Sequence, residues 1–201
     1  MSEESKVPEQ AAAKMPWEEK PVPPQPEEAR DHPQVQELER AVPGAVLEAV
    51  RFAGQITVVV ELAQLFPVLG ALKQLGYKFL VDLTAVDWQD RPQGRFDVVY
   101  WLHRHADSAR LRVKVRVADG VEVPSAVALW PTANWMEREV FDMFGIYFAG
   151  HPNLERILTW EGFAGHPLRK DFPLEGVDTG AAVYPDIYPP GGGPVKPKGG
   201  A

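Results

Sequence analysis

The two histidines His151 and His166 are the side chains of this sequence best placed to do chemistry. Each lies in a copy of the pentapeptide FAGHP, at 148–152 and at 163–167. Histidine is a common metal ligand and a common general base. The glycine before each histidine permits a backbone twist, and the proline after it favours an extended conformation. We therefore interpret each copy as a stiff corner that displays an imidazole.

The rest of the sequence offers these histidines little to act with. The chain contains no cysteine, which excludes disulfides, zinc thiolates, thiol nucleophiles and cysteine-held iron–sulfur clusters. It also lacks an HExxH motif, a GxSxG elbow, a GxGxxG loop and a Walker sequence. We therefore expect no catalytic residue, no metal site and no cofactor-binding residue in this chain.

Composition and charge narrow the class of protein. Hydrophobic residues make up 45% of the chain and charged residues 24%, as in a typical globular protein. The formal net charge of −7 argues against a general nucleic-acid binder. No apolar run approaches the roughly 20 residues that span a bilayer, and the acidic N-terminus does not resemble a secretory signal. We expect a soluble chain that reaches a membrane only through a partner.

Proline-rich ends flank a central domain. Residues 1–33 hold seven prolines and few large apolar groups, so we predict a disordered acidic arm. Residues 177–201 form a similar tail rich in proline and glycine. Between these ends we expect an α+β domain over 34–145 and an extended partner-binding strap over 146–176.

The domain is predicted to be a sheet covered by helices on one face. Hydrophobic periodicity and turn residues indicate these elements: a helix over 33–41, a hairpin of 45–52 and 55–61 around Ala53-Gly54, a helix over 62–75, strands over 77–88, 95–103 and 110–117, and helices near 124–129 and over 132–144. This order predicts an antiparallel or mixed sheet of about five strands, followed by an extended C-terminal segment.

The strand 110–117 alternates strictly between basic and apolar residues. The basic set, which we call the basic stripe, is Arg110, Arg112, Lys114 and Arg116. Such a stripe could bind RNA phosphates, but this strand places no aromatic residue beside it for base stacking. An anion-binding or RNA-binding module is therefore an alternative function, and a solvated strand face or contact with an acidic partner is the simpler interpretation.

Two further segments carry dense charge. In the helix over 132–144, Glu137, Arg138 and Asp142 form either a solvated face or a charged face for another protein, and Arg138 can pair with Asp142 one turn away. In the strap, the segment 166–174 places charges between two prolines. Large apolar residues recur from 157 to 174 with too little regular structure to bury them. We infer that the strap lies on another subunit, with histidine and arginine groups setting its register.

Three motifs in this region resemble a known family. They are EREVFDMFGIYFAGHP over 137–152, RILT over 156–159 and GHPLRKDFPLEG over 165–176. Together they resemble the thirty-kilodalton subunit family of proton-translocating NADH-quinone oxidoreductase, which is respiratory complex I; in bacteria this subunit is designated C. The chain departs from the family pattern at Glu155, where the family usually has arginine.

The resemblance implies a place in the cytoplasmic arm of a membrane complex. There the strap would wrap against the quinone-site subunit, of the forty-nine-kilodalton type, beside other peripheral-arm subunits. FMN and iron–sulfur clusters in partner subunits would carry electrons from NADH to quinone, coupled to proton translocation. The chain would be peripheral, on the cytoplasmic side of the cell inner membrane. The equivalent subunit of a membrane-bound hydrogenase-type complex is a second possibility.

The residues, read together with the resemblance, define a candidate partner interface. Its residues are Glu137, Arg138, Asp142, His151, Arg156, His166, Arg169, Lys170, Asp171 and Phe172. The resemblance assigns a contact role to Arg156 but not to Glu155, whose charge is opposite to the family's usual residue.

Overall fold

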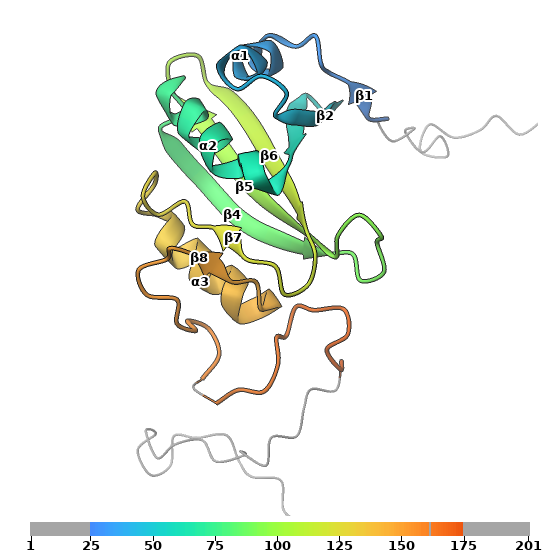
Figure 1. Ribbon diagram of the computed structural model, residues 1–201, viewed down its shortest axis with the longest axis vertical. Helices are drawn as coiled ribbons and strands as arrows, with labels where there is room; N and C mark the ends of the chain where they lie inside the picture. Colours follow the sequence, from blue (N-terminus) through green and yellow to red (C-terminus); the bar gives the residue numbers. More distant parts are fainter. Residues whose placement is uncertain (1–24, 161, 175–201) are drawn as a thin grey trace, which may run out of the picture.

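The computed structural model describes residues 25–160 and 162–174 of the chain (Figure 1). Its main sheet has six strands in the order β1-β2-β3-β6-β5-β4. The strands are β1 (Glu27–Glu28), β2 (Val46–Phe52), β3 (Gln55–Val60), β4 (Phe79–Asp87), β5 (Phe96–Arg104) and β6 (Ala109–Val117). Neighbouring strands are antiparallel except for the parallel pair β3 and β6, so the sheet is mixed.

Three α-helices complete the described part of the domain. They are α1 (Pro33–Ala41), α2 (Leu65–Gln74), which follows the short 3-10 helix η1 (Leu62–Gln64), and α3 (Ala133–Phe144). A second, two-stranded sheet pairs β7 (Val123–Pro124) with β8 (Phe148–Ala149) in parallel. These elements confirm the predicted α+β class.

The hairpin of β2 and β3 follows its predicted turn. Ala53 and Gly54 both adopt positive φ angles, of 47° and 76°, as two-residue hairpin turns of the primed types require. Glycine tolerates this conformation, and the alanine before it carries a modest strain. The turn therefore sets the register in which Arg51 pairs with Ile56 and Phe52 with Gln55.

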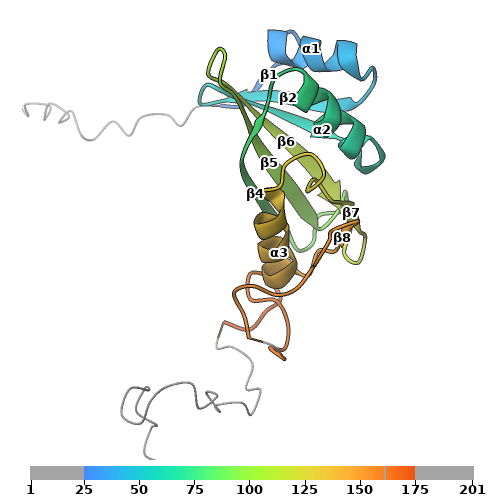
Figure 2. The same cartoon turned by 90° about the vertical axis from the view of Figure 1, so that its left-hand side faces the viewer.

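The core lies between one face of the main sheet and the helices. The apolar half of β6 is almost completely buried, from Leu111 to Val117, and it packs in one cluster with Leu69 and Leu72 of α2. Figure 2 shows α1 and α2 together on one side of the sheet. Phe144 of α3 meets Phe96 of β5 on the same face, with ring centroids 6.4 Å apart. The opposite face carries no helix among the described residues.

Two parts of the predicted element map differ from the structure. The helix expected near 124–129 is wrong, because this segment forms β7 and then a tight turn, in which Trp130 donates to the carbonyl of Ala126. Pro124 and Pro131 enclose a segment too short to sustain a helix. Residues from Gln25 onward also belong to the domain, since β1 pairs with β2. Residues 1–24 and the tail 177–201 lie outside the described residues.

The helix α3 begins and ends where the sequence predicted. Thr132 stands at its N-terminus, although its side chain makes no capping hydrogen bond. Gly145 stands at its C-terminus in the left-handed conformation, with φ of 75°. None of the helices over 25–160 and 162–174 is long and apolar enough to cross a bilayer.

Candidate partner-binding site

Two acidic residues of α3 face inward. Glu137 and Asp142 are fully buried, so the exposure expected for them is wrong. Glu137 accepts hydrogen bonds from the Ser125 hydroxyl at 2.7 Å and from the Ala126 amide at 2.6 Å. Burial raises the pKa of Glu137 to about 7, against the smaller effect of these two hydrogen bonds. Glu137 thus holds the segment after β7 against α3.

Asp142 organises the first part of the strap. Its carboxylate accepts the amides of Ile157, Leu158 and Thr159 at 3.1, 2.7 and 2.8 Å, together with the Thr159 hydroxyl. Arg156 adds an ion pair at 3.3 Å. Burial acts to raise the pKa of Asp142, but the hydrogen bonds outweigh it and leave the pKa below its usual range. Three consecutive amides are therefore fixed by one buried anion.

Arg156 closes this loop of the strap on itself. Its guanidinium donates twice to the carbonyl of Gly165 at 3.1 Å and once to the Thr159 hydroxyl at 3.0 Å. Its charge also lies above the ring of Phe163, 6.0 Å from the centroid. The structure thus brings Arg156 and Asp142 together, which the sequence spacing did not predict.

The two histidine corners contact opposite ends of α3. Nε2 of His151 lies 3.2 Å from the carbonyl oxygen of Asn134, in the first turn of the helix. Nδ1 of His166 lies 2.9 Å from the carbonyl oxygen of Asp142, in the last turn. The last carbonyls of a helix have no partner within it, so His166 satisfies one of them. The imidazoles therefore fasten the strap to its own domain.

Glycines allow these corners to form. Gly150 and Gly165, which precede the two histidines, have φ angles of 80° and 91°. Gly145 lets His166 approach closely, because a Cβ at that position would lie 2.6 Å from its Nε2. The amide of Leu168 also donates to the carbonyl of Met143 at 3.1 Å, which satisfies another C-terminal group of α3.

Arg138 contacts the strap rather than Asp142. Its guanidinium donates to the carbonyls of Glu155 at 3.0 Å and Arg156 at 3.4 Å, and it lies over the ring of Trp135. The predicted pair of Arg138 and Asp142 is wrong, because Asp142 turns toward the strap amides. Glu155 itself is exposed and receives a hydrogen bond from the Asn153 side chain.

A group of charges, which we call the latch, holds the later part of the strap against the sheet. Arg95 forms ion pairs of 2.8 Å with Asp87 at the end of β4 and with Asp171 in the strap. The backbone amide of Lys170 donates to Asp87 at 2.8 Å. Burial acts to raise the pKa of Asp87, but the bonds from Arg95, Lys170 and Gln89 lower it to about 2.

Arg169 and Phe172 complete the contacts of this region. Arg169 pairs with Asp119 and lies over the ring of Phe96, 5.2 Å from the centroid. Phe172 stacks on Phe163 with centroids 6.0 Å apart. The Lys170 side chain points to solvent. Among the ten predicted interface residues, polar atoms therefore mostly serve contacts within the chain.

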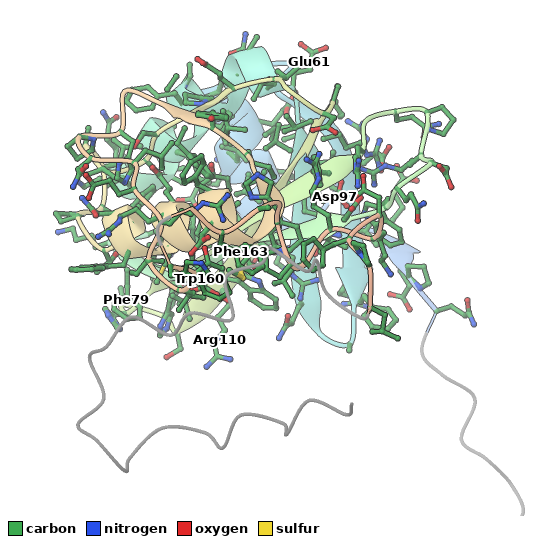
Figure 3. All side chains as sticks on the ribbon, turned by 90° about the horizontal axis from the view of Figure 1, so that it is seen from below. Glu61, Phe79, Asp97, Arg110, Trp160 and Phe163 are labelled. Carbon is green, nitrogen blue, oxygen red and sulfur yellow. The ribbon has the colours of Figure 1, made fainter. Side chains whose placement is uncertain are left out.

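Three large apolar side chains of the strap lie mostly in solvent. Leu158, Trp160 and Leu168 are 63%, 54% and 54% exposed, and we call these three the strap ridge. Trp160 meets Phe163 edge to face, with centroids 4.7 Å apart (Figure 3). Sequence reasoning anticipated apolar groups in need of shelter, but it selected the charged residues as contacts. The strap ridge is the stronger contact surface by exposure.

Two of the four cations of the basic stripe are neutralised by neighbouring carboxylates. Arg116 forms a bidentate pair with Glu48 at 2.8 Å, and Lys114 lies 3.8 Å from Asp97. Arg112 lies over the ring of Trp101, 3.8 Å from the centroid. This arrangement weakens the alternative of an RNA-binding module. Within the two described ranges, no three histidine or acidic side chains gather as a metal site would require.

The α+β domain holds its strap in place, and the strap ridge remains exposed. An exposed group of large apolar side chains is typical of a subunit that packs against another protein chain. Comparison with known proteins identifies the family. The model of the family "Respiratory-chain NADH dehydrogenase, 30 Kd subunit" matches residues 58–178, and the chain belongs to this family. The resemblance found in the sequence motifs is thereby confirmed.

Curated relatives, all NADH-quinone oxidoreductase subunits designated C, agree with this family. The relative from Methylobacterium sp. (strain 4-46) is 41% identical over 160 residues, which cover 75% of this chain and 74% of the relative. The relative from Rhodobacter capsulatus is 48% identical over 137 residues, which cover 67% and 68%. A chain of the archaeal membrane-bound sulfane sulfur reductase shares the fold, with a TM-score of 0.65, 24% identity, and coverage of 83% of this chain and 99% of that chain.

Proposed function

We propose that this chain is a non-catalytic scaffold subunit of a proton-translocating NADH-quinone oxidoreductase. In this role it joins subunits that carry FMN and iron–sulfur clusters and that pass electrons from NADH to quinone. The names of its relatives support the assignment. The absence of cysteine fits a subunit that leaves the clusters to its partners.

The proposed contact is between the strap and the quinone-site subunit. One observation carries this proposal: the backbone amides of residues 157–159 are bound within the chain, while the strap ridge stays exposed. A segment fixed before binding loses less conformational entropy when it docks. Exposed leucine and tryptophan side chains would then supply the apolar centre of the interface.

The charged residues have a positioning role in this account. Asp142, Arg156 and His166 set the path of the strap, and Arg169 and Asp171 fasten its end to the sheet. The complex would hold the chain peripherally on the cytoplasmic side of the inner membrane. The equivalent subunit of a hydrogenase-type complex differs in its electron donor, so NADH-driven quinone reduction separates the two assignments.

The test is co-purification of the quinone-site subunit with the tagged full chain. We expect a variant carrying Trp160→Ser and Leu168→Ser to melt like the parent but to recover at least about tenfold less partner, since a central interface residue contributes about 2 kcal/mol or more. Phe66→Ser on α2 is the control, because Phe66 is also a half-exposed aromatic residue. Equal recovery with all variants, or intact NADH-driven quinone reduction in membranes that lack the chain, would overturn the proposal.

A further inference from the structure

The open face of the main sheet holds a second group of unusual surface residues. Phe52, Phe79 and Trp101 lie there with His103, Arg110 and Arg112, and we call these six the sheet patch. The register aligns Phe52 with Gln55, Arg110 with His103, and His103 with Phe79 across the strands. Phe52 and Phe79 remain nearly half exposed. This patch lies on the face opposite the core and is distinct from the strap.

Cations of the sheet patch differ from their neighbours in the basic stripe. Arg116 and Lys114 have carboxylates within 4 Å, at Glu48 and Asp97. Among the described residues, the Arg112 guanidinium contacts the Gln55 side-chain oxygen at 2.8 Å and the face of Trp101, and it forms no ion pair. Arg110 makes no ion pair with any residue of 25–160 or 162–174, and it points away from the domain (Figure 3). Within the part of the chain that the structure describes, these two positive charges are left without an acidic partner, although the whole chain has a net charge of −7.

A hollow lies beside these cations. Side chains of Phe79, Val81, Trp101, His103 and Arg110 line it, and its volume is about 240 Å³. The Nε2 atom of His103 is buried there without a hydrogen-bond partner among the described residues. The hollow therefore combines aromatic walls, one polar atom without a partner and a guanidinium at its rim, which is the composition of an interface centre.

We propose that the sheet patch binds an acidic extended segment of a neighbouring subunit, with an apolar side chain in the hollow and a carboxylate on Arg110. Charge complementarity selects this occupant. A second copy of the chain would set the same cations against each other around a two-fold axis. RNA would find the ring of Trp101 already covered by Arg112 and would meet the carboxylates of Glu48 and Asp97 near its phosphates.

Oxidative footprinting tests the proposal on the full chain alone and on the intact purified complex. We expect oxidation of Phe79 to fall at least about fivefold on assembly, because burial at an interface excludes water from its centre. Oxidation of Trp160 in the strap, measured in the same experiment, tests the contact between the strap and a partner on which the proposed function rests. If assembly protects Trp160 from oxidation but not Phe79, this inference alone is overturned. If assembly protects neither residue, the proposed function is overturned too.

The identity of the occupant is tested by a photo-crosslinking amino acid placed at Phe79 in the complex. We expect the crosslinked peptide to be an acidic segment of another subunit, and a crosslink to a second copy of this chain or to RNA would contradict the proposal. Arg110→Glu should weaken retention of the chain at moderate salt by roughly tenfold, as loss of a charge pair at an interface does. Arg40→Glu on the exposed face of α1 is the matched control. Equal retention of the two variants would exclude Arg110 from the contact.

Discussion

At the scale of residues, buried carboxylates decide how this chain is organised. Asp142 is stabilised in its charged form by backbone amides and Arg156, whereas Glu137 has no cation among its hydrogen-bond partners. The hydroxyl of Tyr100, buried nearby, has no hydrogen-bond partner in the described ranges, and burial raises its pKa further above that of an exposed tyrosine. Glu137 and Asp142, which lie on the same helix, therefore have opposite shifts in pKa.

Glu137 predicts a dependence of stability on pH. Its pKa in the folded chain is about 7, above the usual value of 4.5, so between these pH values the folded state binds more protons than the unfolded state. Stability should therefore fall as pH rises through this window, by about 3 kcal/mol from this group alone. In Glu137→Gln, urea unfolding at about pH 5 and pH 8 should lack this loss. If the stability of Glu137→Gln depends on pH as that of the parent chain does, a group other than Glu137 titrates in this window.

The close contact between Gly145 and His166 predicts that substitutions at these two positions affect the free energy of unfolding non-additively. Gly145→Ala should destabilise the chain by about 2–3 kcal/mol, because alanine is strained at positive φ and its Cβ would overlap the imidazole. In a His166→Ala background, Gly145→Ala should destabilise the chain by only about 1 kcal/mol, because only the strain of alanine at positive φ then remains. Urea unfolding of the two single variants and the double variant measures the coupling. Strict additivity would mean that the close contact carries no energy.

At the scale of elements, the latch joins the end of β4 to the strap. Arg95 contacts Asp87 and Asp171, and Lys170 reaches Asp87 through its amide. The two attachments of the strap, at α3 and at the sheet, lie far apart in sequence. They turn a segment with little regular secondary structure into a fixed part of the domain.

Arg95→Gln should loosen the strap and destabilise the domain by roughly 3–5 kcal/mol, because it leaves the buried Asp87 carboxylate without its cation. Hydrogen exchange at the amide of Lys170 should accelerate in parallel. Arg40→Gln, at an exposed position of α1, should change neither quantity. Exchange at Lys170 as slow as in the parent chain would contradict the role of the latch.

The same site predicts a response to acid. The pKa of Asp87 is about 2 in the folded chain, below its usual 3.8, so its contribution to stability is complete above pH 3.8 and is lost as pH falls through 2. Arg95→Gln should reduce this acid-dependent loss in unfolding experiments between about pH 4 and pH 2. A parent chain whose stability is as insensitive to acid as the variant's would contradict the pairing.

The elements were largely predictable, and the site was predictable only in part. Alternation in β6 and the turn at Ala53-Gly54 are local signals, so they identified strands and a hairpin directly. The contacts of Asp142 with residues 157–159 depend on how the chain returns to α3, and periodicity cannot show this. Spacing along a helix suggested the pair of Arg138 and Asp142, but three backbone amides of the strap compete successfully for that carboxylate.

At the scale of the whole molecule, the chain is organised as a scaffold with two proposed contact surfaces. Helices and core occupy one face of the sheet, the strap is fastened beside α3, and the opposite face carries the sheet patch. The chain belongs to the family of the 30 Kd subunit of respiratory-chain NADH dehydrogenase. Its central physical feature is that the strap takes its shape from contacts inside the chain and leaves the strap ridge exposed.

Hydrogen exchange of the isolated full chain tests this feature most directly. The amides of Ile157, Leu158 and Thr159 should exchange at least about a hundredfold more slowly than in an unstructured peptide, because each donates to the buried Asp142 carboxylate. Asp142→Asn should remove most of that protection while β5 and β6 stay protected. Exchange of these three amides at the unstructured rate in the parent chain would show that the strap forms only on a partner, which would contradict a strap shaped by contacts within the chain.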